Sequence, residues 1–544
     1  MLIPVVQATS TIQNARTVYK HIPISGSIAV LLIGVTKPQD VVSDASKYLV
    51  GVLQPVNEGQ REQALDKLLE VIQKQPLKSS MISQDVCEAA VNECNEVEEE
   101  DCDKILSVID AFTIPRFTYV SERKKFIPNS TMDVAQPVLL GDAKTKADLF
   151  RDRYIILHQR TSRHELFTPA ILGEQTDSKK FQLKPIEYLL GSTSKLGEMI
   201  VLGMLTQLKE CFTVNCFKPF LHPLKKGWYE DEIFHVNAFG FPPPEPASVT
   251  RNYFGNMNFF GGPSPICVKA SVKLKQIEQE NEEAMFVILS DVWLDQAKVV
   301  DRLKVLFAGY SQMPPTCFIF CGNFTSTPYG PNHIKILKES LKNLADILVE
   351  YPVLLERSRF IFVPGPQDPG FSIILPRPSI PKVVTDDFVR RVPSAEFTSN
   401  PCRIQYCTRE IVVFREDIVM KMCRNCVRYP TDGDISKHFS KTVICQAHLC
   451  PLPLHVEPIY WAYDNALRVY PLPDLIICAD KYDPYSETQV DCTIANPCSQ
   501  LSCIQSLSTG GSTVVTSFQD PALCYGRGLL FIYTFSGSGI PRSI

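Results

Sequence analysis

The chain has 544 residues, of which 45% are hydrophobic and 21% charged, values typical of a globular protein with several domains and a large core. The 55 basic and 59 acidic residues give a formal net charge of −4. This balance argues against a strongly basic nucleic-acid-binding protein, although it leaves room for a local basic patch.

The cysteines and the apolar runs indicate the compartment. The 19 cysteines lack the dense, regular spacing of a secreted disulfide scaffold, so we expect mostly buried free thiols in a reducing compartment. The apolar run at 27–35 is too short to span a bilayer and lacks a clear signal-peptide layout. We therefore expect a soluble intracellular protein with no membrane association.

The first part of the chain predicts a small helical domain behind a segment without a pattern. Residues 1–58 show no lasting helical or alternating period, so they stay unassigned and we expect them to be poorly ordered. From 59 to 128, apolar residues recur at helical spacing in a stretch long enough to fold alone. The expected elements are helices at Leu65–Ile72, Val86–Val91 and Ile105–Ile109, a hairpin at 115–127 and a linker at 129–148.

Residues 149–270 predict a small β-barrel of the OB type, since strand-like runs occur at 199–205 and 228–241. The segment 211–226 between them is rich in Phe, Pro and Cys and does not alternate, so we expect part of the barrel to be absent or altered there. Few Lys or Arg residues flank these strands. This favours a protein-contact barrel over a barrel that binds single-stranded DNA.

A polar motif, HQRTSRHELF, follows the helix expected from Lys146 to His158. Its two arginines, Arg160 and Arg163, lie between His158 and His164 and could bind phosphate. A surface turn is the commoner explanation of such a cluster, and we favour it.

Residues 271–491 predict a layered α/β domain. Met285–Leu289 is an unbroken apolar run, typical of a strand buried on both faces, and Asp291 follows it. Helical segments alternate with more such runs, and each run ends in a short polar turn where sheets of this kind bind ligands. The remaining tail, 492–544, is atypical and we expect low order in it. The further runs lie at 317–321, 360–363, 410–414 and 473–478.

The polar turns resemble, in degenerate form, the ligand boxes of calcineurin-like metallophosphoesterases, which hold two metal ions that activate water and clamp phosphoester oxygens. Asp291 matches that pattern, but Trp293 replaces a histidine and has no lone pair for a metal. We therefore expect no metal, no cofactor and no catalysis. The vestigial positions in this chain are Asp291, Trp293, Asn323, Ser326, Gln367, Asp368, Phe414, Asp480 and Tyr482.

Longer motifs resemble the B subunits of the eukaryotic replicative DNA polymerases, which pair an OB domain with an inactive phosphoesterase domain. Among them are FHVNAFGFPP, SDVWLDQ, FVPGPQDPGF and YWAYDNALRVYPLPDLIICADKYDP, within a resemblance that extends from Gln60 to Asp491. It implies a multidomain α+β protein with a small N-terminal helical domain similar to the lid of AAA+ ATPases, an OB-type β-barrel and a layered α/β calcineurin-like phosphoesterase domain.

The same resemblance implies a function and a set of partners. It indicates a nuclear, non-catalytic accessory subunit for DNA replication and repair, which holds the zinc-binding C-terminal domain of the catalytic subunit. Small histone-fold subunits and components of the replicative helicase would be further partners, and DNA would be reached mainly through the complex. Two alternatives stay open: a divergent metal-dependent phosphodiesterase or nuclease, and an OB-type single-stranded DNA binder.

A Cys-x-x-Cys pair, Cys423 and Cys426, lies near Cys445, His448 and Cys450 in the sequence. A zinc site could be built from such residues. A second pair of regular spacing is lacking, so we favour buried thiols.

Overall fold

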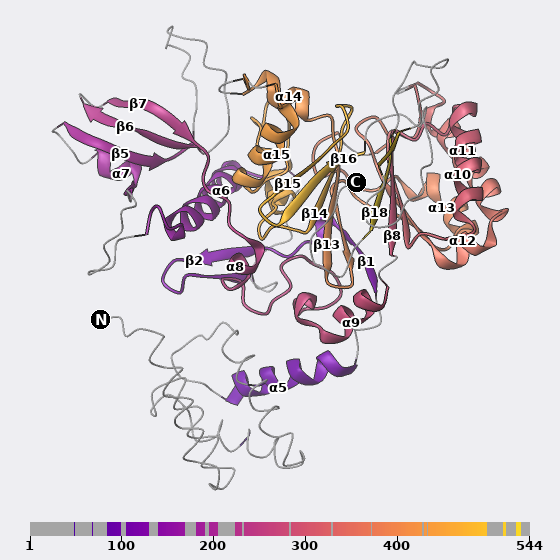
Figure 1. The fold of residues 1–544 in the computed structure, drawn as a ribbon, viewed down its shortest axis with the longest axis horizontal. Helices are drawn as coiled ribbons and strands as arrows, with labels where there is room; N and C mark the ends of the chain where they lie inside the picture. Colours follow the sequence, from indigo (N-terminus) through magenta and orange to yellow (C-terminus); the bar gives the residue numbers. More distant parts are fainter. Residues whose placement is uncertain are drawn as a thin grey trace.

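Two six-stranded sheets of the described residues pack face to face, with helices on their outer faces and a smaller sheet to one side (Figure 1). The architecture comes from a computed structural model. It describes residues 48, 68, 84–99, 105–129, 140–168, 181–190, 195–204, 223–230, 233–281, 284–327, 330–370, 373–426, 429–431, 433–497, 515–517 and 529–534.

The first large sheet has the strand order β11-β10-β9-β8-β18-β17. Its strands β8 to β11 run parallel, and β18 pairs antiparallel with β8. The predicted alternation of strand and helix is confirmed here. The strands are β8 (Met285–Ser290), β9 (Cys317–Cys321), β10 (Arg359–Val363), β11 (Ala395–Phe397), β17 (Val515–Ser517) and β18 (Leu529–Thr534). The helices are α10 (Ala297–Tyr310), α11 (His333–Val349), α12 (Pro352–Arg357) and α13 (Lys382–Arg391).

The second large sheet has the order β1-β12-β13-β14-β16-β15. Its central strands β13, β14 and β16 run parallel, and β1, β12 and β15 pair antiparallel with their neighbours. The strands are β1 (Leu106–Asp110), β12 (Cys402–Tyr406), β13 (Arg409–Arg415), β14 (Leu475–Ala479), β15 (Tyr485–Gln489) and β16 (Cys492–Asn496). Helices on its outer side are α14 (Val419–Arg424) and α15 (Ile435–Gln446) (Figure 1).

Alternation along the strands builds three apolar layers. Val287 and Leu289 of β8 face the helices α10 to α13, whereas Phe286 and Ile288 face the second sheet. In β13, Val413 lies between the sheets and Val412 faces outward. Because successive side chains point to opposite faces, each large sheet contributes to two of the three layers. The continuous apolar runs in the sequence have this origin.

The small sheet has the order β4-β5-β6-β7 and lies in the region predicted to be an OB barrel. Helix α6 (Ala143–Arg163) precedes it and is capped by Asp142, whose carboxylate accepts a hydrogen bond from the Thr145 N–H at 2.7 Å. The predicted linker therefore ends earlier than 148. The strands are β4 (Leu183–Lys184), β5 (Leu196–Leu202), β6 (Leu224–Glu230) and β7 (Ile233–Gly240), with α7 (Ile186–Leu190) between the first two.

Shorter elements connect these layers. The predicted hairpin is confirmed as β2 (Phe117–Val120) and β3 (Lys125–Pro128). The others are α5 (Gln84–Glu99), η1 (Ala111–Thr113), α8 (Ala247–Arg251), η2 (Val268–Ala270), α9 (Val272–Glu280) and η3 (Trp461–Leu467). Within the described residues, the helices are all too short or too polar to cross a membrane.

Two expectations about element type and extent are wrong. Residues Leu106–Asp110, predicted as a third helix of the N-terminal domain, form strand β1 beside β12. Val108 and Ile109 are β-branched and pack into different apolar layers, which a strand allows. At the other end, Cys492–Asn496 is strand β16 between β14 and β15, so the second sheet continues past the expected boundary at 491. Of the altered segment 211–226, Leu224–Lys226 belongs to β6, and 211–222 lies outside the described residues.

Candidate functional site

The carboxyl ends of strands from both large sheets meet at one edge. Ser290, Cys321 and Val363 are aligned at the ends of β8, β9 and β10, and Arg415 is aligned with Ala479 in the second sheet. The turns that follow hold a group of polar side chains. We name it the strand-end cluster: Asp291, Asn323, Asp368, Arg415 and Asp417.

Asp291 lies directly after β8 with a φ of 50°, a left-handed conformation that Asp tolerates better than most residues. Its side chain is fully buried. One carboxylate oxygen, Oδ1, accepts hydrogen bonds from the Asn323 N–H at 2.8 Å, the Asn323 side-chain amide at 3.2 Å and the Arg415 guanidinium at 2.9 Å. The tight turn therefore directs the carboxylate back into the interior.

Arg415 is the last residue of β13, and its side chain is fully buried. Its Nη1 donates to Asp417 Oδ1 at 2.7 Å and to the Ala479 carbonyl at 3.2 Å, while its Nε donates to the Gly322 carbonyl. Burial disfavours the charged guanidinium, but the carboxylates of Asp291 and Asp417 more than offset it, so the pKa of Arg415 is raised. Burial would raise the pKa of Asp417, but the Arg415 guanidinium holds it below its ordinary value.

Close packing of two turns completes the strand-end cluster. The Asp368 carboxylate accepts from the backbone N–H groups of Phe324 and Gly365, each at 2.8 Å. A Cβ on Gly322 would lie 1.9 Å from Asp368 Oδ2, and a Cβ on Gly365 would lie 2.5 Å from Asn323 Oδ1. Glycine is therefore required at both positions by contact. Burial raises the pKa of Asp368 to about 6, although both N–H groups favour its charged form.

The structure brings together only part of the predicted set. Asn323 Oδ1 accepts from the Gln367 N–H at 2.9 Å, so Gln367 joins the cluster through its backbone. Ser326 instead binds the Asp295 carboxylate through its N–H at 2.9 Å and its hydroxyl at 2.5 Å. Trp293, which is partly exposed, donates its backbone N–H to the Asp291 carbonyl at 3.0 Å.

The other predicted positions have structural roles. Asp480 Oδ2 accepts from the N–H groups of Ile418 and Val419 at 2.6 and 2.9 Å, and Oδ1 accepts from the Tyr482 N–H at 2.8 Å. Asp480 therefore organises the turns after β13 and β14 rather than pointing an open carboxylate into the strand-end cluster.

The placement of Phe414 at the site is wrong. Phe414 lies on the outer face of β13, in the apolar layer beside α15, and the next residue, Arg415, faces the strand-end cluster. Successive strand residues point to opposite faces, so a shift of one position exchanges them. The charged run Arg415-Glu416-Asp417 directly after an apolar strand was the sequence signal that could have identified Arg415 and Asp417.

A second buried ionic group joins α6 to η3 and to the segment after α15. We name it the α6 junction: Arg153, His448, Asp464 and Arg468. Asp464 Oδ1 accepts from Arg153 at 2.5 Å and contacts His448 Nε2 at 3.2 Å, and Oδ2 accepts from Arg468 at 3.0 Å. Burial would raise the pKa of Asp464, but Arg153, His448 and Arg468 hold it well below its ordinary value. Helix α6 is thereby fixed against η3.

The motif HQRTSR is the last part of α6, so its assignment to a surface turn is wrong. Arg160 is buried and donates to the Cys445 carbonyl at 2.6 Å. Arg163 pairs with Glu245 at 2.6 Å, and its guanidinium carbon lies 3.7 Å from the centroid of the Tyr253 ring. Since both guanidinium groups are engaged by the protein itself, they support the join between α6 and its neighbours rather than phosphate binding.

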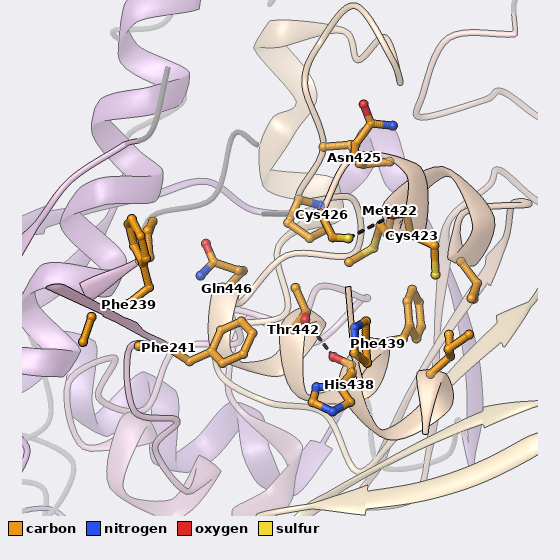
Figure 2. Close-up of a pocket in the computed structure, with 18 of the residues that line it drawn as sticks. Phe239, Phe241, Met422, Cys423, Asn425, Cys426, His438, Phe439, Thr442 and Gln446 are labelled. Atoms are coloured by element: carbon orange, nitrogen blue, oxygen red, sulfur yellow. Dashed lines mark hydrogen bonds between the residues drawn. The ribbon is translucent and has the colours of Figure 1, made fainter. Parts of the chain in front are cut away.

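An open apolar groove lies between β7 and the helices α14 and α15 (Figure 2). It has a volume of about 510 Å³. Figure 2 shows Phe239 and Phe241 on one side of it and Met422, Cys426 and Phe439 on the other. Among the described residues that line the groove there is no Asp, Glu, Lys or Arg. An uncharged, aromatic lining suits an apolar segment of a protein and does not suit a phosphate backbone.

Cys423 and Cys426 line this groove, and the Cys426 thiol donates to the Cys423 carbonyl at 3.0 Å. Cys445 and Cys450 are buried. Within the part of the chain that the structure describes, no three or more His, Cys, Asp or Glu side chains form a group that could hold a metal ion. The geometry of these residues therefore does not support the zinc site considered from the sequence.

The lysines of the small sheet are largely occupied. Lys195 pairs with Glu230 at 2.9 Å, and Lys226 pairs with Glu198 at 3.0 Å. Burial lowers the pKa of Lys225. A surface that binds single strands needs unpaired basic groups along the backbone path, with aromatic rings for the bases. These pairings make the described part of the small sheet a poor DNA-binding face.

Comparison with known sequences first gives the class of protein. The family of DNA polymerase alpha/epsilon B subunits matches residues 286–487, which span most of the two large sheets. The DNA polymerase epsilon subunit 2-like OB-fold domain matches 143–215, and the DNA polymerases epsilon N-terminal family matches 40–94. The first of these matches confirms the resemblance to polymerase B subunits, and the second confirms the OB-type domain.

Individual relatives narrow the class further. DNA polymerase epsilon subunit 2 of Bos taurus is 56% identical over 481 residues, which cover 84% of this chain and 90% of the relative. The Homo sapiens protein of the same name is 55% identical with the same coverage. The chain belongs to the DNA polymerase epsilon subunit 2 family.

One solved structure, described as a novel archaeal phosphodiesterase, covers 40% of this chain and 84% of its own at 11% identity. Its TM-score of 0.21 is too low to support any conclusion about this chain.

Proposed function

We propose that this chain is a non-catalytic accessory subunit of the DNA polymerase epsilon complex. It would scaffold the catalytic subunit in chromosomal DNA replication and repair in the nucleus. The observation that carries the non-catalytic part is the fully buried Arg415 guanidinium bound to Asp291, the residue that matches the first metal ligand of active phosphoesterases. A site filled by a protein cation has no room for a metal-bound water.

The partner would be the zinc-binding C-terminal domain of the catalytic subunit, seated on the groove between β7 and α14/α15. The uncharged lining, with Phe239 53% exposed on one side and Met422 on the other, supports this assignment because interface cores are poor in charge and rich in aromatic residues and Met. Small histone-fold subunits and components of the replicative helicase would bind elsewhere. DNA would be reached mainly through the complex.

The proposed domain division follows from this function. The region predicted as the N-terminal helical domain would contribute β1 and the β2–β3 hairpin to the scaffold core. The OB-type sheet would present β7 to the partner, and the two large sheets would act as an inactive phosphoesterase-like platform. The predicted phosphoesterase positions, among them Asp291, Trp293 and Asn323, would be relics whose present use is to hold turns.

A capture experiment tests the proposal. The full chain should bind the purified C-terminal domain of the catalytic subunit, and Phe239→Asp or Met422→Asp should weaken capture by about tenfold or more, as for a buried anchor of an interface. Val305→Asp is the matched control, because Val305 is an exposed apolar residue on α10, away from the groove. No capture by the unaltered chain would reject the proposed function. Full capture by the groove variants would reject the groove alone.

A phosphodiesterase assay tests the alternative that the chain is a metal-dependent enzyme. With Mn²⁺ and bis-p-nitrophenyl phosphate we expect no turnover above the uncatalysed rate. If the unaltered chain turned over the substrate and Asp291→Ala abolished this activity, the proposal that the chain is non-catalytic would be rejected.

A further inference from the structure

The residues at the strand ends do not fit the two metal ions that the phosphoesterase fold family implies. Trp293 offers no lone pair to a metal. The Asn323 side chain is committed, since its Oδ1 accepts from the Gln367 N–H at 2.9 Å and its Nδ2 donates to Asp291 Oδ1 at 3.2 Å. What remains are separated carboxylates that are already hydrogen-bonded to the protein.

The Arg415 guanidinium supplies the positive charge there. It lies 2.9 Å from Asp291 Oδ1 and 2.7 Å from Asp417 Oδ1 and is fully buried. A divalent ion bound to either carboxylate would stand beside this guanidinium, in an interior where like charges repel strongly. The guanidinium and a metal therefore exclude each other.

The guanidinium also joins the two large sheets. Arg415 belongs to β13 and donates to the carbonyl of Ala479 in the neighbouring strand β14. It reaches across to the first sheet through Asp291, after β8, and the carbonyl of Gly322, after β9. Planar arginine is suited to this task because its donors point in fixed directions.

We infer that Arg415 is a built-in cation that replaces the metal ions of this fold and fastens the two sheets at their carboxyl edge without any metal. The inference goes beyond the proposed function, because it concerns how the platform is held together and not what binds it. Asp291 Oδ2 has no hydrogen-bond partner among the described residues. The charge of Asp291 is therefore balanced mainly by Arg415.

Chemical rescue tests the inference. Arg415→Ala should lower the melting temperature of the full chain by about 3–5 °C, because it leaves buried carboxylates without a counter-ion. Methylguanidinium at low millimolar concentration, or Mn²⁺, should restore part of this loss by binding the folded state in the vacated space. For the unaltered chain, we expect a chelator to leave the melting temperature unchanged.

Arg403→Ala is the matched control. Arg403 is also a buried arginine, but its hydrogen bonds go to the carbonyls of Phe259, Phe260 and Arg468 and not to a carboxylate. The Arg403→Ala variant should melt at a lower temperature than the unaltered chain, and Mn²⁺ should not restore its melting temperature. Equal Mn²⁺ rescue of both variants, or a chelator-induced fall in the melting temperature of the unaltered chain, would overturn the inference.

A pair of variants covers the case in which Arg415→Ala does not fold. Arg415→Met alone leaves Asp291 charged and unpaired, whereas Arg415→Met combined with Asp291→Asn removes both charges. The double variant should melt higher than Arg415→Met alone. A double variant that melts lower, by the sum of the two single losses, would show that the two residues are not a coupled ion pair.

Discussion

The strand-end cluster and the α6 junction are both buried groups in which aspartate meets arginine, yet they do different work. The first lies between the two large sheets and contains one arginine, Arg415, shared by two carboxylates. The second lies between helix α6 and η3 and contains one carboxylate, Asp464, shared by two arginines and a histidine. The difference teaches that the shared central group decides which substitution is worst, whereas a titratable neighbour such as His448 decides whether stability falls in acid.

The largest effect is expected at the shared carboxylate of the α6 junction. Asp464→Ala would leave Arg153 buried without its carboxylate, so the free energy of unfolding should fall by about 3–5 kcal/mol. Thermal or urea unfolding of the full chain measures this. Asp387→Ala removes an exposed carboxylate from a surface pair with Lys338 and should leave stability nearly unchanged. Similar losses for both variants would contradict a special role of the α6 junction.

The histidine should make the α6 junction lose stability in mild acid, whereas the strand-end cluster should gain stability there, because burial raises the pKa of Asp368 to about 6. His448 Nδ1 accepts from the Cys450 N–H at 3.0 Å, so its proton lies on Nε2, which donates to Asp464. Burial first, and then Arg153, lower the pKa of His448 to about 4 from 6.5, while Asp464 opposes them.

The sign of the pH dependence follows from that shift. In the unfolded chain His448 takes up a proton below about pH 6.5, whereas in the folded chain it does so only near pH 4. The contribution of His448 to stability is therefore fully present above pH 6.5 and is lost as the pH falls. The loss should reach about 3 kcal/mol by pH 4. Unfolding curves at pH 7 and pH 4.5 measure it, and His448→Gln should flatten the curve. An unchanged slope in that variant would assign the pH dependence to another group.

The smallest of the three effects tests how closely the strand-end cluster is packed. Gly322→Ala places a Cβ against Asp368 and should reduce stability by about 2 kcal/mol. Gly309→Ala in α10 is the control, since a Cβ there meets no atom within 4 Å, and it should be neutral or slightly stabilising. Equal stability of the two variants in urea unfolding would mean that the turns can move apart.

Much of the two-sheet core could be predicted from the sequence, because unbroken apolar runs and helical spacing alternate clearly from Met285 to Val363. The same reasoning located Asp291 and Asn323 correctly at the strand ends. It failed at Leu106–Asp110, a five-residue strand too short to distinguish its period from that of a helix.

Other failures have physical causes of a different kind. Arg160 and Arg163 look like surface residues because arginine usually is exposed, and only tertiary contacts with Cys445 and Glu245 show otherwise. Phe414 and Arg415 are adjacent on β13 and face opposite sides of the sheet, and the sequence alone does not show which of the two faces the strand-end cluster. No local pattern could have paired Asp291 with an arginine more than a hundred positions away.

Helix α6 links the two kinds of sheet, and this has a consequence for cooperativity. It leads into the OB-type sheet, yet Ile156 and Leu157 belong to the apolar layer of the second large sheet. The OB-type domain match begins at 143, inside a helix whose Arg153 is paired with Asp464, 311 positions later. Melting either part removes the support of the other. The chain should therefore lose both in a single calorimetric transition, and a fragment that ends before 270 should not fold alone.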